Sequence, residues 1–198
     1  MDAVHVGVPF TSTALAELAT RSCSRIFVLA NRSSASLAAP LVAALQESGQ
    51  LAAPLCTDIG MGGGEEGLLR ACDAAAAAGA DAVVTIGGGA IHDAGKLLRL
   101  WLSAGSTGSA SIDGIRAVAE RAELNLAPQV CLPNSFAMAE LTSVAGATTR
   151  ANVKSGAAHA ALMPSVVVYD PALSAGLPDW VRYGTALRGK CGTVLHPP

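Results

Sequence analysis

The sequence predicts an α/β fold, a doubly wound, mostly parallel sheet with helices on both faces. Short apolar runs alternate along the chain with longer Ala- and Leu-rich stretches of helical pattern. The run at 81–86 is rich in β-branched residues and does not alternate with polar ones, which is typical of a strand buried on both faces of a parallel sheet. Strand, helix and strand at this spacing indicate βαβ units.

The first half of the series contains two strands and two helices. They are a strand at 26–29, a helix over 37–49, a weaker strand over 50–56 and a helix over 65–80. Gly49 stands where the first helix should end, because glycine readily adopts the left-handed conformation that closes a helix. Glu65 and Glu66 fall in the first turn of the second helix, where the helix dipole favours acidic side chains.

The second half begins with the run at 81–86 and continues with a helix and two further strands. In chain order we expect three glycines at 87–89, a helix over 90–102, a strand and turn at 129–135 and a strand at 165–171. The segment 103–114 is rich in Ser and Gly, so we predict a mobile surface loop there.

Composition and charge exclude several classes of protein. The chain has 198 residues, 51% of them hydrophobic and 14% charged, so it can bury a core and is not a disordered segment. Its 13 basic and 15 acidic residues give a net charge of −2. We therefore expect no nucleic-acid binding, which takes clustered Lys and Arg. The apolar stretches are interrupted well before the roughly 20 residues that cross a bilayer, so no membrane partner is expected.

The cysteines and the first residues indicate a cytoplasmic protein. Five cysteines, odd in number, are scattered along the chain, which is typical of reduced core residues rather than disulfides or a zinc site. They are Cys23, Cys56, Cys72, Cys131 and Cys191. The first ten residues contain no basic segment of the kind that opens a secretory signal.

The stretch 85–96, TIGGGAIHDAGK, carries the clearest chemical motif. A buried strand runs into three glycines, and a helix begins at once. Glycines let the backbone approach a ligand closely, and a helix N-terminus offers free N–H groups, so together they suit a pyrophosphate. The spacing is neither Gly-x-Gly-x-x-Gly, since His92 takes the third position, nor a Walker A loop. Taken alone, the run also fits a simple strand-to-helix turn.

Three ordered motifs resemble those of one enzyme family. The glycines, with Asp93 and Lys96 after them, are similar to Gly-Gly-Gly-Ser-x-x-Asp-x-Ala-Lys of the iron-containing alcohol dehydrogenase superfamily. That superfamily includes maleylacetate reductases and is related to dehydroquinate synthase. Residues 132–142 resemble its Pro-Thr-Thr-x-x-Gly-Ser-Glu-x-Thr segment, in the form closest to maleylacetate reductases. Residues 164–178 resemble its Pro-x-x-Val-Ile-Tyr-Asp-Pro-x-Leu-Thr-x-Gly-Leu-Pro run.

The resemblance implies that the chain binds NAD or NADP. Carried over position by position, it assigns to the cofactor Asn31, Gly87, Gly88, Gly89, Asn134, Ser135, Thr142 and Lys154. Asn31 falls where the family often has an Asp for the adenosine ribose. A neutral Asn with Arg32 beside it would tolerate a 2′-phosphate, so both cofactors stay open. Asn31 and Arg32 could instead form a plain exposed turn, and Thr142 could be a cap or core hydroxyl.

Two neighbouring residues are candidates for the chemistry. The resemblance places Asp93 near the nicotinamide and the substrate. His92, beside it, would lie at the mouth of the cofactor cleft, where an imidazole can act as an acid or base. A plainer alternative for Asp93 and Lys96 is a solvated ion pair, because they are three residues apart on a helix. His92 could likewise be a surface or core residue.

The family's metal ligands have no counterpart in this sequence. An ungapped alignment of its Gly-Met-Asp-Ala-Leu-x-His segment falls on residues 186–192, where Arg188 replaces the Asp and Gly192 replaces the His. Neither side chain can ligate a cation, so we expect no metal. Arg188 could instead hold a substrate carboxylate or stabilise oxyanion charge, or it could be a surface residue.

Family members carry a second, helical half, and the resemblance implies that this C-terminal domain is absent here. We expect a dinucleotide-binding domain at 1–178 and the truncated start of the helical domain at 179–198. The function implied is metal-independent, NAD(P)-dependent reduction of a small molecule, a carboxylate-bearing ketone or enoate. A homodimer or a second chain could cover the exposed cleft. The alternatives are a non-redox lyase, isomerase or cyclase on the same fold, or a non-catalytic nucleotide-binding domain.

Overall fold

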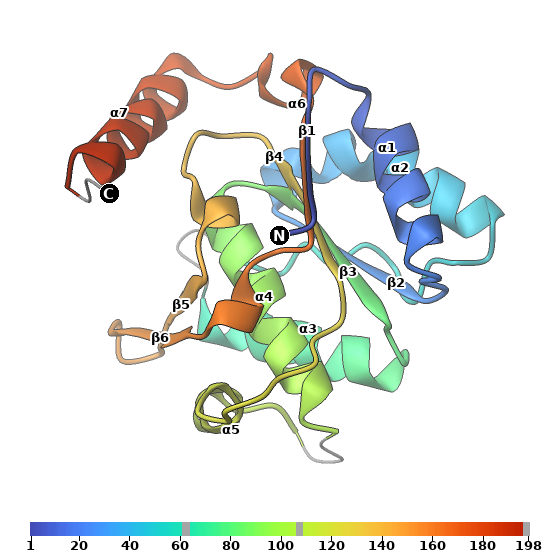
Figure 1. The fold of residues 1–198 in the computed structure, drawn as a ribbon, viewed down its shortest axis with the longest axis vertical. Coiled ribbons are helices and arrows are strands. Elements are labelled where there is room, and N and C mark those ends of the chain that lie inside the picture. The colour runs from blue at the N-terminus through green and yellow to red at the C-terminus, as the bar shows by residue number, and fades with distance from the viewer. Residues whose placement is uncertain (61–63, 106–108, 196–198) are drawn as a thin grey trace.

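A computed structural model describes residues 1–60, 64–105 and 109–195, with side chains as far as residue 187. Figure 1 shows a central sheet between two layers of helices, with α7 reaching away from them. The sheet has five strands in the order β1–β7–β4–β3–β2, and all four neighbouring pairs are parallel. The five strands are β1 (Ala3–Val6), β2 (Ile26–Ala30), β3 (Ala82–Gly87), β4 (Gln129–Pro133) and β7 (Val166–Tyr169).

Helices cover both faces of the sheet, as the sequence predicted. The helices are α1 (Phe10–Thr20), α2 (Ala35–Glu47), α3 (Glu65–Ala77), α4 (Gly89–Ser103), α5 (Ile112–Ala119), α6 (Pro171–Ser174) and α7 (Asp179–Leu195). Side chains of β2 alternate between two cores, because successive residues of a strand point to opposite faces. Phe27 and Leu29 pack with α3, α4 and α5, whereas Ile26 and Val28 pack with α1, α2 and α6. The doubly wound arrangement is thus confirmed.

The weaker strand expected over 50–56 forms only two isolated bridges, from Leu51 to Ile26 and from Cys56 to Leu29, both parallel. Pro54 stands between them, and proline cannot donate a backbone hydrogen bond to a ladder. The segment therefore runs along the edge of β2 without becoming a sixth strand.

The prediction of a loop over 103–114 is wrong in part. Residues 112–114 form the first turn of α5, and Ser111 caps it by accepting a 3.1 Å hydrogen bond from the backbone N–H of Gly114. Ile115 and Val118 are buried against the core that α4 shares. A good N-cap and an apolar stripe outweigh the Ser- and Gly-rich composition here. Residues 106–108 of this segment lie outside the described residues.

Several elements have no counterpart in the sequence prediction. Besides β1 and α1, they include an antiparallel hairpin inserted between β4 and β7, formed by β5 (Val144–Thr148) and β6 (Lys154–Ala158). Short 3₁₀ turns occur at η1 (Arg32–Ser34), η2 (Ala139–Leu141) and η3 (Ala160–Leu162). The hairpin is built largely from Ala, Gly, Ser and Thr, so it lacks the bulky β-branched pattern that marks a strand in a sequence.

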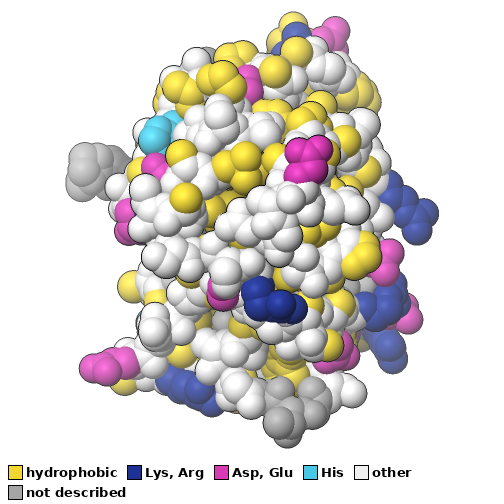
Figure 2. All heavy atoms as spheres, turned by 90° about the vertical axis from the view of Figure 1, so that its right-hand side faces the viewer, with side chains coloured by type: hydrophobic (Ala, Val, Ile, Leu, Met, Phe, Trp, Pro, Cys, Tyr) yellow, Lys and Arg dark blue, Asp and Glu magenta, His cyan; other side chains and the backbone are white. Residues whose placement is uncertain are grey.

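The surface and the helices can be compared with the expectation that the chain binds neither nucleic acid nor a membrane. Figure 2 shows the face that α1 and α2 form, where charged side chains of both signs are interspersed with apolar ones. Among the helices of the described residues, none has the length and apolarity that crossing a membrane requires. The division at residue 178 stays a prediction, although α7 begins at Asp179.

Candidate functional site

The carboxyl ends of β2, β3 and β4 meet at one edge of the sheet, and a small polar or glycine residue follows or ends each strand. The backbone N–H of Asn134, after β4, donates a 3.0 Å hydrogen bond to the carbonyl of Gly87 on β3. A Cβ at Gly87 would lie 3.1 Å from Oδ1 of Asn31, after β2. The sheet therefore brings Asn31, Gly87 and Asn134 together. Ligands of open α/β sheets bind at such a crevice outside the carboxyl ends of the strands.

The glycine turn leaves the start of α4 accessible. Gly87 has a φ of +154°, which a residue with a side chain rarely adopts. Gly88 is the N-cap of α4, and no side chain caps this helix end. Gly88 and Gly89 are partly exposed. The first N–H groups of a 15-residue helix thus face an open edge, where its dipole favours an anion such as a pyrophosphate.

The same glycines allow the loop after β4 to pack over the helix start. A Cβ at Gly88 would lie 3.0 Å from Oγ of Ser135, and one at Gly89 would lie 3.1 Å from Cβ of Ala137. Ser135 therefore stands beside the uncapped N-terminus, as its assignment to the cofactor requires. A side chain at either position would press on this loop, so glycine lets the loop lie close to the helix start.

Asn31 is tied to its own turn. Its side chain and that of Ser34 form a reciprocal capping box at the start of η1, and Nδ2 of Asn31 donates a 3.0 Å hydrogen bond to Oγ of Ser33. Oγ of Ser34 also lies 3.0 Å from the carbonyl of Ile86 on β3. The turn is thereby fixed against the neighbouring strand, and Arg32 within it is exposed. A cationic side chain therefore stands in the turn that follows the carboxyl end of β2.

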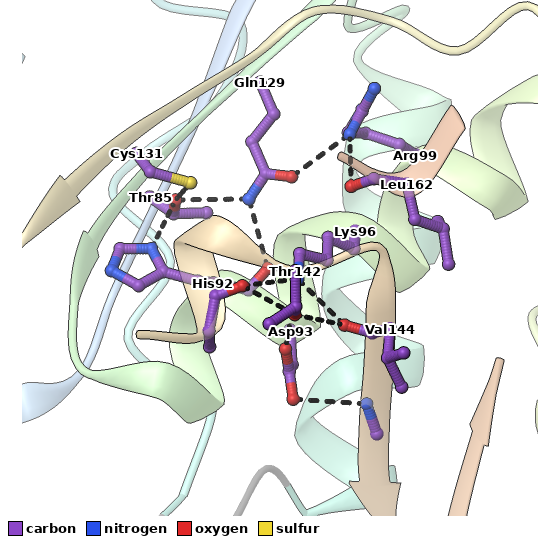
Figure 3. Close-up of polar contacts among 12 residues, drawn as sticks. Thr85, His92, Asp93, Lys96, Arg99, Gln129, Cys131, Thr142, Val144 and Leu162 are labelled. Atoms are coloured by element: carbon purple, nitrogen blue, oxygen red, sulfur yellow. Dashed lines mark hydrogen bonds and ion pairs between the residues drawn. The ribbon is translucent and has the colours of Figure 1, made fainter. Parts of the chain in front are cut away.

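Lys96 is fully buried, which excludes the solvated ion pair that its spacing from Asp93 allowed. Its Nζ donates hydrogen bonds to the carbonyls of Ala139 (2.6 Å) and Val144 (2.8 Å) and to Oγ1 of Thr142 (3.1 Å). It lies 3.6 Å from Oδ1 of Asp93. Figure 3 shows these partners around the ammonium group. Burial lowers the pKa of Lys96 and raises the pKa of Asp93.

Lys96 brings two of the assigned residues together. Thr142 is exposed and bonded to Lys96, and Asp93 accepts a 3.2 Å hydrogen bond from the backbone N–H of Gly146 on β5. Lys154, exposed on β6, is close enough for its charge to lower the pKa of Asp93 in part. The segment from Thr142 to the hairpin thus borders α4 beside the glycine turn.

His92 does not lie at the mouth of a cleft, so that expectation is wrong. The side chain is fully buried beneath the glycine turn, with Nδ1 2.9 Å from Oγ1 of Thr85 on β3. Burial lowers the pKa of His92 to about 3, and the charge of Lys96 adds to this shift. The imidazole is therefore neutral near pH 7. A helix packed this closely on a sheet turns residue 92 inward, which its place next to Asp93 in the sequence does not indicate.

Arg188 lies on α7, but its side chain is outside the described part of the chain. Its role as a substrate-binding residue therefore stays a prediction. Within the described residues, no group of three His, Cys, Asp or Glu side chains could hold a metal ion. The expectation of a metal-free protein likewise remains untested.

Sequence reasoning assigned no role to several buried polar residues. Glu140 is almost fully buried, and the hydroxyl of Tyr169 donates a 3.0 Å hydrogen bond to its Oε1. Burial raises the pKa of Glu140. Arg99, also buried, donates to the carbonyl of Ala127 (2.6 Å) and to Oε1 of Gln129 (3.3 Å). No local pattern in the sequence indicated their burial, because their partners lie 28 to 30 positions away along the chain.

Comparison with known proteins decides the family. The model of the iron-containing alcohol dehydrogenases matches residues 7–171. The chain belongs to the iron-containing alcohol dehydrogenase family. The resemblance inferred from the three motifs is therefore confirmed, and members of this family bind NAD(P).

Relatives within the family include maleylacetate reductases. The one from Rhizobium sp. (strain MTP-10005) is 34% identical over 118 residues, which make up 60% of this chain and 27% of that protein. Its crystal structure matches with a TM-score of 0.70 and 30% identity, over 94% of this chain and 46% of that one. The maleylacetate reductase from Agrobacterium tumefaciens gives a TM-score of 0.72 at 24% identity, over 94% and 45% of the two chains.

A solved structure that contains NAD+ has the same fold as this chain. The sulfoacetaldehyde reductase from Bifidobacterium kashiwanohense, in complex with NAD+, gives a TM-score of 0.78 at 16% identity, over 94% of this chain and 49% of that one. At that identity the match shows the fold alone. The chain spans less than half the length of all three solved structures, and it corresponds to the N-terminal half of the family.

Proposed function

We propose that this chain binds NAD(P) at the carboxyl edge of its sheet and forms the cofactor side of a reductase site. The observation that carries the proposal is the partly exposed N-terminus of α4, which no side chain caps and which is formed by Gly88 as N-cap and Gly89 as first residue. Gly87, Gly88 and Gly89 would hold the pyrophosphate through backbone N–H groups, because a helix N-terminus and its dipole favour an anion. Family membership supports the same cofactor.

The rest of the cofactor would follow the edge in both directions from the glycine turn. On the β2 side, Asn31 would meet the adenosine ribose. On the β4 and hairpin side, the neighbouring residues are Asn134, Ser135, Thr142 and Lys154, with Asp93 behind them. When bound, the reduced nicotinamide would supply the hydride that reduces the substrate. The protein's part is to orient the ring and to exclude water from it.

We further propose a substrate class, a ketone or enoate that carries a carboxylate, reduced without a metal ion. The support is the likeness to maleylacetate reductases, at 30% to 34% identity. Arg188 would bind the carboxylate from α7, because a guanidinium matches its two oxygens. A second copy or another chain would supply the facing wall of the cleft. Four free cysteines in the described residues fit a reducing compartment such as the cytoplasm.

The test is a titration of the purified chain with NADH and with NADPH, followed by nicotinamide fluorescence. Gly88→Asp places a carboxylate where the pyrophosphate should bind, and it should abolish saturable binding. The matched control is Gly49→Asp, since Gly49 is exposed, has open space around it and precedes Gln50, whose carbonyl accepts a hydrogen bond from Ile26 at the amino end of β2, the opposite edge of the sheet. Each variant is checked for cooperative thermal unfolding.

Each outcome separates the candidate functions. Binding that is lost only in Gly88→Asp supports the cofactor site and justifies a screen of carboxylate-bearing ketones and enoates. Turnover without net change in nicotinamide absorbance would favour a lyase, isomerase or cyclase. No binding to the folded wild-type chain would refute the proposal.

A further inference from the structure

Helix α4 carries two buried cations, Lys96 and Arg99, that bind backbone carbonyls. Lys96 is fully buried and Arg99 is 3% exposed. An unpaired charge in such a place costs several kcal/mol, so both persist because oxygen acceptors surround them. Figure 3 shows the two groups one helical turn apart, each directed at a different part of the chain.

Lys96 holds the segment 139–144, which connects the loop after β4 to the hairpin. All three of its N–H groups are used, on the carbonyls of Ala139 and Val144 and on Oγ1 of Thr142, at 2.6 to 3.1 Å. The segment has little regular structure of its own, only the short turn η2 and the first residue of β5. The ammonium group therefore holds the two ends of the segment, Ala139 and Val144, at one point, while Tyr169 holds Glu140 between them.

This segment also forms one side of the proposed cofactor site. Cβ of Ala139 would lie 3.3 Å from a Cβ at Gly89, so the segment packs directly on the start of α4. Met138, just before it, has a φ of +59°, and left-handed backbone at a residue with a side chain persists only where its surroundings hold it. If the contacts to Lys96 were lost, this side of the glycine turn would no longer be fixed.

We infer that Lys96 is a positioning residue for the cofactor, whose ammonium group holds segment 139–144 beside the N-terminus of α4 and so sets the affinity for NAD(P) without touching it. The inference rests on the proposed function. It adds a role for a residue that lies behind the cofactor edge and that makes its contacts only with protein oxygens in the described chain.

Arg99 provides a matched control inside the same helix. It binds the carbonyls of Ala127 (2.6 Å), Ala161 (3.3 Å) and Leu162 (3.4 Å). These carbonyls precede β4 and β7 and so lie toward the amino ends of the strands, at the opposite edge from the glycine turn. Its burial and chemistry match those of Lys96, but its partners do not border the proposed site.

The experiment compares Lys96→Met with Arg99→Met. For each variant we measure the free energy of unfolding with denaturant and the dissociation constant of NADH and NADPH by fluorescence. Both variants should lose stability. Lys96→Met should weaken cofactor binding by roughly tenfold to a hundredfold, the size of effect expected from a small misplacement of a binding group. Arg99→Met should leave the dissociation constant within about twofold.

Hydrogen exchange supplies a second readout. Amides of 139–146 should exchange faster in Lys96→Met and unchanged in Arg99→Met. If Lys96→Met does not fold, Lys96→Arg, which keeps the buried charge but alters its geometry, takes its place and should also weaken binding. Equal cofactor affinity in folded Lys96 variants and wild type would overturn the inference alone. Absence of binding to the wild-type chain would overturn the proposed function and the inference with it.

Discussion

The hydroxyl of Tyr169 donates a 3.0 Å hydrogen bond to Oε1 of Glu140. The bond joins the carboxyl end of β7 to the turn η2, which lies between the glycine edge and the hairpin. Glu140 is 1% exposed, and within the described residues its Oε2 has no hydrogen-bond partner. Tyr169 is thus a main polar partner of a buried carboxyl group.

Tyr169→Phe should therefore destabilise the protein. The substitution keeps the ring but removes the hydroxyl that donates to Oε1 of Glu140, and an unsatisfied buried acceptor costs about 1–3 kcal/mol. Chemical denaturation measures the change in the free energy of unfolding. Tyr183→Phe is the control, because Tyr183 is exposed on α7, and it should have no effect. Equal stability of the two variants would show that the bond contributes nothing.

The buried imidazole of His92 predicts a loss of stability in acid. Its pKa is lowered to about 3 in the folded chain from the ordinary 6.5. Between these two pH values, the imidazole therefore binds a proton in the unfolded chain but not in the folded chain. The stability is complete above pH 6.5 and falls as the pH decreases from there toward 3, by at most about 1.4 kcal/mol per pH unit. Stability measured against pH in wild type and in His92→Asn tests this.

Asparagine at position 92 can still meet Thr85 through its amide but has no proton to bind in this range. The difference in stability between wild type and His92→Asn should therefore shrink between pH 6.5 and 4. A difference independent of pH would mean that His92 also titrates normally in the folded chain. His5, which is half-buried against Glu17, serves as a comparison through His5→Asn.

The strands covered on both faces could be predicted from the sequence, whereas β1 and the polar interior could not. Ile26 to Leu29 of β2 and Ala82 to Ile86 of β3 are buried on both faces, so their apolar runs are continuous. In β1, Val4 and Val6 are exposed, so the same signal is missing. An edge strand with one uncovered face does not produce an unbroken apolar run.

The sequence around Lys96 contains no pattern that indicates its burial. Asp93 three residues earlier suggests a surface ion pair, and only contacts with residues 43 to 48 positions later remove the ammonium from water. A motif comparison assigned the glycines, Asn134 and Ser135 to the cofactor; this assignment stays a prediction, and the structure brings these residues together at the carboxyl ends of β3 and β4. Glu140 and Tyr169 each fell within a matched motif, but their pairing depends on tertiary structure.

Replacing Gly95 by the alanine of the family signature should lower the stability of the protein. The family signature has Ala where this chain has Gly95, yet a Cβ there would lie 2.5 Å from Cγ2 of Thr85 and 2.6 Å from Nε2 of Gln129. Gly95→Ala should therefore push α4 away from the sheet and destabilise the protein by about 1–3 kcal/mol. The free energy of unfolding is again the measurement.

The control for that substitution is Gly184→Ala on α7, where a Cβ has open space. Alanine favours a helix over glycine by about 1 kcal/mol, so this variant should gain stability or stay unchanged. Gly95→Ala combined with Gln129→Ala should cost less than the sum of the two single variants, because the shorter side chain removes one clash. Additive costs would place the strain elsewhere.

The turn at Asn31 should set the ratio of the affinities for NADPH and NADH. Asn31 is neutral, and Arg32 beside it is exposed, so a 2′-phosphate on the adenosine ribose would meet a cation and no carboxylate.

Asn31→Asp introduces the acidic side chain that binds the ribose 2′-OH and repels the phosphate. The ratio of NADPH to NADH affinity should therefore fall, by roughly tenfold for 1.4 kcal/mol of repulsion. Arg32→Ala should lower the same ratio by weakening the binding of NADPH alone, whereas Arg121→Ala, at an exposed site just beyond the end of α5, should leave it unchanged. The salt dependence distinguishes the cause, since an ionic contact with the phosphate weakens as ionic strength rises. An unchanged ratio in both Asn31→Asp and Arg32→Ala would mean that the ribose lies away from this turn.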